Sequence, residues 1–195
     1  DPGVDQIVDN LVYCPQSIWG YYKFTAPNFQ YHITETAYNK PCYVTLRRTG
    51  RVHIHIHSNI DVATPAICVG KRSGDTSITD RFISNMRVAL QARDISDVEV
   101  NYSKTAGSAC AAAPNTYGRD QLGVEITRAL AVEMGSQAYM CGARVPLATS
   151  TFGAFWQALS ATFPECTKVG AGGGQSTFPR AGCGVGCGND PQCGA

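Results

Sequence analysis

The clearest pattern in this chain is the strict alternation of apolar residues and histidines over residues 52–57. In an extended strand, successive side chains point to opposite faces of the sheet. We therefore predict a strand over residues 51–57 with one apolar face on the core and one face of imidazoles. The apolar set is Val52, Ile54 and Ile56, and the imidazole set is His53, His55 and His57.

Three other segments in the first part of the chain, 18–25, 29–36 and 42–47, also predict strands. They are rich in aromatic and β-branched residues, which favour extended backbone. Residues 48–50, Arg-Thr-Gly, form a compact turn between 42–47 and the histidine strand. We therefore expect those two strands to form a hairpin.

The apolar spacing changes from two to four after residue 76, which predicts helices. Ile78, Phe82, Met86 and Leu90 lie at that spacing, in a helix that begins at Ser77. The same reasoning, with short apolar runs taken as strands, gives the remaining elements. We expect a short helix near Val4–Leu11, a strand at 98–102, a helix at 120–134, a strand at 138–142 and a helix at 151–163.

Strands followed by alternating helices and strands indicate an α+β fold. We predict a mainly antiparallel sheet with about three helices packed on one face, an α/β sandwich stapled by disulfides. Residues 1–168 form this single domain. Residues 169–195 are rich in glycine and cysteine, and we expect a tail that disulfides tie to the domain.

The cysteines indicate an oxidising compartment. There are nine of them, spread along the chain without paired Cys-x-x-Cys knuckles, which favours a disulfide framework over a structural zinc site. The chain begins at Asp1 with no apolar leader, as a processed mature protein does. We therefore expect a secreted, extracellular protein. The cysteines are Cys14, Cys42, Cys68, Cys110, Cys141, Cys166, Cys183, Cys187 and Cys193.

Charge and hydropathy exclude some classes of protein. Lysines and arginines number 16 against 15 acidic residues, which gives a net charge of +1 and no strong nucleic-acid signal. No apolar run approaches the roughly 18 residues of a transmembrane segment.

The histidines are the strongest candidates for chemistry. Two imidazoles at positions i and i+2 of a strand can reach one metal ion, and a neighbouring strand can supply a third ligand. His32, His53, His55 and His57 would then hold zinc, which catalytic sites bind through three protein ligands and an open position.

Several metal-free interpretations of the same strand remain open. The alternation also fits an amphipathic strand whose imidazoles face water. Neighbouring imidazoles can act as a pH sensor, since they repel one another when protonated. A histidine, a glutamate and an arginine on one sheet face can cleave RNA by general acid–base catalysis, and the candidates are His55, Glu35 and Arg47.

Two further motifs predict processing. Lys71-Arg72 is a dibasic pair in a Gly/Ser loop, where a secretory-pathway protease would cut. Asn101-Tyr-Ser103 is an N-glycosylation sequon.

These features support two classes of function. The first is a secreted, disulfide-rich toxin or virulence effector that binds a protein or surface component of a host or competitor organism. It needs no cofactor and rests on the fold, since no catalytic motif is recognisable. The second is a secreted hydrolase that uses the histidine cluster, either with zinc or as a metal-free, ribonuclease-like enzyme.

The odd number of cysteines gives a first test. Non-reducing mass mapping should find three or four disulfides, with three free thiols or one. Nine free thiols would contradict the secreted assignment.

Overall fold

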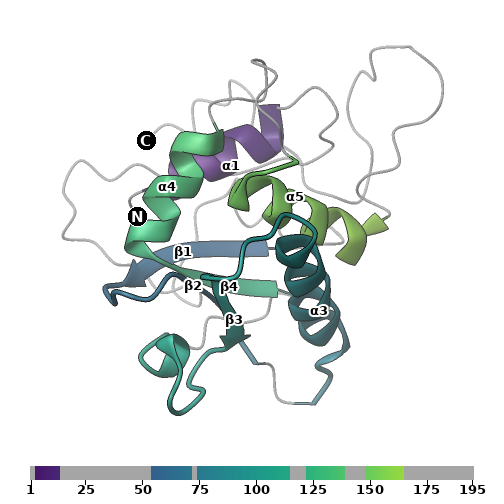
Figure 1. Cartoon of the computed structure of the whole chain (residues 1–195). Coiled ribbons are helices and arrows are strands. Elements are labelled where there is room, and N and C mark those ends of the chain that lie inside the picture. Colours follow the sequence, from purple (N-terminus) through teal and green to yellow (C-terminus); the bar gives the residue numbers. More distant parts are fainter. Residues whose placement is uncertain (1–2, 14–53, 72–73, 115–121, 139–147, 165–195) are drawn as a thin grey trace, which may run out of the picture.

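A computed structural model describes residues 3–13, 54–71, 74–114, 122–138 and 148–164 (Figure 1). In chain order it contains α1 (Val4–Tyr13), β1 (Ile54–Ile60), β2 (Ala66–Val69), α3 (Ser77–Gln91), β3 (Glu99–Tyr102), the 3-10 turn η2 (Ala109–Ala111), β4 (Leu122–Thr127), α4 (Arg128–Ala138) and α5 (Thr151–Thr162).

The four described strands form one mixed sheet in the order β1-β4-β2-β3. β1 runs parallel to β4, β4 antiparallel to β2, and β2 parallel to β3. The fold is α+β as expected, but the expectation of a mainly antiparallel sheet is wrong. The chain leaves β2 through α3 before it enters β3, and such a crossover brings the second strand back parallel to the first.

The expected hairpin is not visible in this sheet. Its partner segment 42–47 lies outside the described residues, as do the predicted strands at 18–25 and 29–36. Among the residues that the structure describes, β1 pairs with β4. The tail 169–195 also lies outside them.

The four helices among the described residues pack on one face of the sheet. The main core joins apolar residues of α1, α3, α4 and α5 to every second residue of the strands, such as Ile67, Val124 and Val100. Figure 1 shows α1, α4 and α5 above the strands, with the turn around η2 below them. Phe82 of α3 and Phe155 of α5 meet edge to face, with ring centres 5.8 Å apart. The predicted helices that begin at Ser77 and Thr151 are confirmed.

The predicted helix at 120–134 is wrong in its first half. Leu122–Thr127 is the strand β4, and the helix α4 begins only at Arg128. Leu122 and Ile126 are four residues apart, a spacing that suits one face of a helix and one face of a strand alike. β4 lies between two strands with all six residues buried, which is the environment of a central strand.

Glycines let α1 approach α4 closely. Gly3 precedes α1 with a φ of +78°, a conformation that disfavours other residues. A Cβ on Gly135 of α4 would lie 2.8 Å from the carbonyl oxygen of Gly3. A larger residue at Gly3 or Gly135 would therefore push the two helices apart.

Gly135→Ala should therefore lower the free energy of unfolding by about 1–3 kcal/mol, the usual cost of overpacking. At an unobstructed helical site the same change would raise it by about 1 kcal/mol, because alanine is the better helix former. Urea unfolding measures the free energy of unfolding of the parent and the variant. Val132→Ala, at an exposed position of the same helix, is the control. A stabilised Gly135→Ala variant would contradict the close contact.

Candidate functional site

His55 and His57 lie on the sheet face turned away from the helices, which we call the second face. Their neighbours Ile54 and Ile56 pack against the main core, so the imidazoles project the other way. Both side chains are partly buried. Their rings meet edge to face with centres 5.9 Å apart. The predicted division of this strand into an apolar and an imidazole face is confirmed at these four residues.

The sheet register aligns four side chains in one row across the second face. His57 of β1 is the register partner of Glu125 in β4, and Glu125 is the partner of Cys68 in β2. Cys68 is in turn the partner of Asn101 in β3. Register partners project to the same face, and neighbouring strands lie about 4.8 Å apart. His57 and Glu125 are therefore adjacent, and so are Glu125 and Cys68.

Glu125 is the functional candidate that the sequence analysis missed. Its side chain is only 1% exposed, although carboxylates are rarely buried without a polar or charged neighbour. The predicted helix at 120–134 gave it no special position. The alternation Leu122, Val124, Ile126 was the signal that could have placed it, since a strand puts Glu125 opposite that apolar set.

The neighbouring row has a different composition. The register partner of His55 is Gly123, and the N–H of Gly70 donates to the carbonyl oxygen of Gly123 at 2.9 Å. β4 therefore places a carboxylate beside His57 and no side chain beside His55. The two histidines have similar neighbours in sequence, but only His57 has a carboxyl side chain as its register partner in β4.

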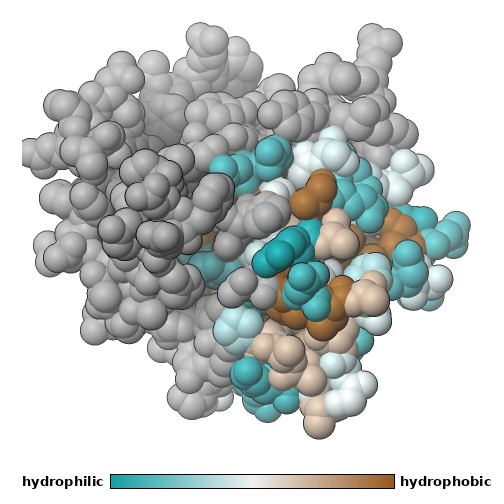
Figure 2. Space-filling model, turned by 90° about the vertical axis from the view of Figure 1, so that its left-hand side faces the viewer, coloured by the Kyte–Doolittle hydropathy of each residue, from teal (hydrophilic) through white to brown (hydrophobic). Residues whose placement is uncertain are grey.

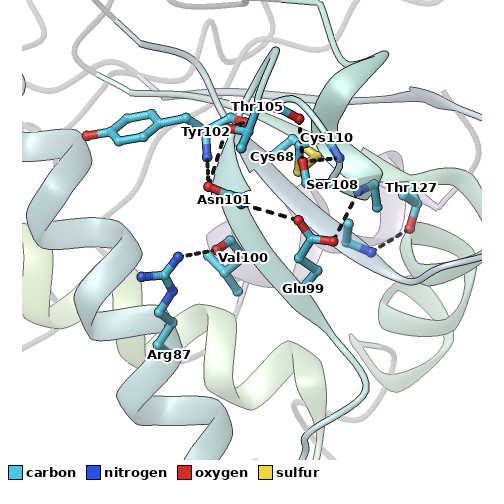
Figure 3. The surroundings of a disulfide bond; sticks show 12 residues. Cys68, Arg87, Glu99, Val100, Asn101, Tyr102, Thr105, Ser108, Cys110 and Thr127 are labelled. Atoms are coloured by element: carbon cyan, nitrogen blue, oxygen red, sulfur yellow. Dashed lines mark hydrogen bonds between the residues drawn. A yellow bond between two sulfur atoms is a disulfide. The ribbon is translucent and has the colours of Figure 1, made fainter.

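A disulfide-linked turn covers the β2 and β3 side of the second face (Figure 3). Cys68 is bonded to Cys110 of η2, and both residues are fully buried. A carboxylate oxygen of Glu99 accepts the N–H of Ala109 at 3.0 Å. The N–H of Lys104 donates to the carbonyl oxygen of Cys110 at 2.8 Å. These bonds fix the turn against the sheet next to the row that contains Glu125.

The other predicted ligands and catalytic residues all lie outside the described residues. This applies to His32, His53, Glu35 and Arg47. Within the described part of the chain, no group of three or more histidine, cysteine or acidic side chains could hold a metal ion. The zinc site stays a prediction, because its complete ligand set lies partly in segments that are not described.

The two processing motifs also stay predictions. Lys71 is exposed after β2, with its Nζ 5.3 Å from the centre of the Tyr102 ring, while Arg72 lies outside the described residues. Asn101 uses its amide in the fold, since its Oδ1 accepts the N–H of Tyr102 at 2.9 Å. The hydroxyl of Ser103 is buried and has no hydrogen-bond partner in the described part of the chain.

A separate groove of about 440 Å³ lies between α3 and β3, the last of the described strands in the sheet order. The guanidinium of Arg87 donates to the carbonyl oxygen of Val100 at 2.7 Å, so this cationic side chain satisfies a backbone acceptor of β3. Exposed Val88 lies beside it. Figure 2 shows a different side of the molecule, the left-hand side of Figure 1, where the described hydrophobic residues occur in small patches interrupted by hydrophilic ones. The lining residues are Asp80, Ile83, Ser84, Arg87, Val88, Gln91, Asn101 and Tyr102.

Asp80 and Tyr102 join the two sides of this groove. The Tyr102 hydroxyl donates to one carboxylate oxygen of Asp80, and the Thr76 hydroxyl donates to the other at 2.6 Å. The bonds from Thr76 and Tyr102 hold the pKa of Asp80 below its ordinary value. Burial, followed by the bond to Asp80, raises the pKa of Tyr102.

Comparison with known proteins does not assign a function. The chain matches no protein-family model, and neither the curated proteins nor the solved structures include a significant match to it. None of the helices among the described residues is long and apolar enough to cross a membrane.

The lowered pKa of Asp80 predicts a pH-dependent contribution to stability. A carboxyl group whose pKa is depressed by folding stabilises the fold above its unfolded pKa. That contribution is lost as the pH falls through the folded pKa. Asp80→Asn should therefore lower the melting temperature at pH 6 and change it much less at pH 2. Exposed Asp97→Asn is the control, and an equal effect of Asp80→Asn at both pH values would contradict the assignment.

Proposed function

We propose that the second face carries a metal-free acid–base site that cleaves RNA, as the ribonuclease-like interpretation of the histidines suggests. One observation supports this proposal most. His57 is the register partner of Glu125, a carboxylate with only 1% of its side chain exposed, and His55 lies beside His57. A glutamate on the histidine face is part of the trio that such chemistry needs, although it is Glu125 and not the predicted Glu35.

The burial of Glu125 decides how the roles are divided. A side chain that is 1% exposed cannot touch a polymeric substrate, so Glu125 acts on its neighbour His57. A carboxylate beside an imidazole orients the ring and stabilises the positive charge that forms when the ring takes a proton. His57 is therefore the general base, and His55 is the general acid.

RNA is the substrate class that this pair can process without a metal ion. The 2′-hydroxyl attacks the phosphorus while His57 takes its proton, and His55 gives a proton to the departing 5′-oxygen. The products are a 2′,3′-cyclic phosphate and a free 5′-hydroxyl. The ring centres lie 5.9 Å apart, so the two imidazoles can address two oxygens around one phosphorus.

A second candidate function is binding without catalysis, as expected of a secreted effector or toxin that recognises a host or competitor surface. The groove between α3 and β3 favours this alternative, since it combines Arg87, Asp80 and Tyr102 with exposed Val88. Both candidates assume secretion. The buried Cys68–Cys110 disulfide supports an oxidising compartment.

Cleavage of a short RNA in EDTA tests the catalytic proposal. His57→Ala and His55→Ala should each lower kcat/KM by about 10²- to 10⁴-fold, the usual contribution of a general acid or base. Glu125→Gln keeps the size of the side chain and should lower kcat by at least about tenfold, since it removes the charge that stabilises the His57 cation.

The control for Glu125→Gln is Glu133→Gln, the same change on the exposed surface of α4, which should leave the rate unchanged. The same oligonucleotide with 2′-deoxyribose should not be cleaved, because it lacks the nucleophile. Activity that requires added zinc would instead favour the metal-dependent hydrolase. A parent protein that cleaves no RNA would contradict the catalytic proposal and leave binding as the better account.

A further inference from the structure

The Cys68–Cys110 disulfide lies beside Glu125 on the side opposite to His57. Cys68 is the register partner of Glu125 across the antiparallel β2–β4 pair, and such partners have Cβ atoms about 5 Å apart. Neither cysteine is exposed. The carboxyl-bearing position in β4 therefore has an apolar disulfide on one side and an imidazole on the other.

This arrangement affects the electrostatics of the site. The interaction between two charges grows as the surrounding dielectric falls, so excluding water from one side of a carboxylate strengthens its effect on a neighbour. The disulfide and the apolar cluster around it, including Ile60, Ala66 and Ala113, fill the β2 side of the second face. Water that reached this side would screen Glu125 and let its side chain change position.

The bridge also anchors the covering turn. Cys110 lies in η2, and the chain between Cys68 and Cys110 contains α3 and β3. Beyond the disulfide, Glu99 binds the N–H of Ala109, and the Ser108 hydroxyl accepts the N–H of Cys110 at 3.1 Å. These bonds position the turn, and the disulfide fixes it directly beside the Glu125 row.

We propose that Cys68 and Cys110 are positioning residues of the histidine site, which act through Glu125 on His57. The proposal rests on the function proposed above for His57, but it makes a separate structural claim. The disulfide excludes water from one side of the Glu125 carboxylate and keeps the carboxylate directed toward the imidazole of His57. Its role is thus local, in addition to the stabilisation that any disulfide gives to a fold.

His55 supplies an internal control. It is adjacent to His57 in the same strand, but its register partner is Gly123 instead of a carboxylate. A change transmitted through Glu125 should therefore affect His57 and spare His55. A general loosening of the sheet should affect both.

The test compares the oxidised full chain with the variant Cys68→Ala/Cys110→Ala. Removing both cysteines avoids leaving a reactive thiol. We expect the imidazole NMR resonances of His57 to move by more than those of His55. We expect kcat on RNA to fall on the order of tenfold to a hundredfold at nearly constant KM, as when a catalytic group is misplaced. Cys68→Val/Cys110→Ala, which keeps more apolar volume, serves if the alanine pair does not fold.

Each outcome decides between the claims. Unchanged His57 resonances in a folded variant would overturn the positioning role, and so would equal shifts of His55 and His57. If the parent cleaves no RNA but His57 alone responds to loss of the bridge, the positioning claim stands and the proposed function fails. If RNA is cleaved and kcat is unaffected by loss of the bridge, the proposed function stands and the positioning claim fails.

Discussion

The pairing of β4 with both of its neighbours is the constraint on which the structure depends. β4 bonds to β1 on one side and to β2 on the other, and its six residues are also buried on both faces. Strand side chains alternate with period two, which leaves no freedom in their placement. Leu122, Val124 and Ile126 enter the helix-covered core, and Glu125 must then enter the second face between His57 and Cys68.

This constraint gives the two faces of the sheet different roles. The helix-covered face is apolar and contains aromatic contacts such as Phe82 with Phe155. The second face contains two imidazoles, a buried carboxyl group and a disulfide, and His57, Glu125 and Cys68 lie in one row across it. The apolar face supplies the burial that stabilises a domain of this size. The second face can therefore hold the side chain of Glu125, whose burial would otherwise cost stability.

The sequence predicted well those elements whose periodicity had a single interpretation. The alternation around His55 and His57 placed them opposite Ile54 and Ile56, and the spacing of Phe82 and Met86 identified α3. It predicted poorly where two periods coincide. Leu122 and Ile126 satisfy both a helix and a strand, so β4 was assigned to a helix and Glu125 was overlooked.

Strand direction was also beyond the reach of local patterns. The pairing partner of a strand is set by contacts between distant segments, such as Ile56 with Val124. Alternation predicts which side chains share a face, but not which strand lies beside them. Residues 66–69, which form β2, were not predicted as a strand, so the parallel crossover from β2 through α3 to β3 was missed as well.

The most direct test of this account is the register of β1 against β4. Nuclear Overhauser effects measured on the oxidised protein should connect the side-chain protons of Glu125 with those of His57 on one side and Cys68 on the other. Val124 should instead show contacts to the helix-covered core. Contacts between Glu125 and core residues such as Phe82 or Phe155, with Val124 beside the histidines, would show a one-residue slip. Such a slip would move the carboxylate to the other face and contradict the site.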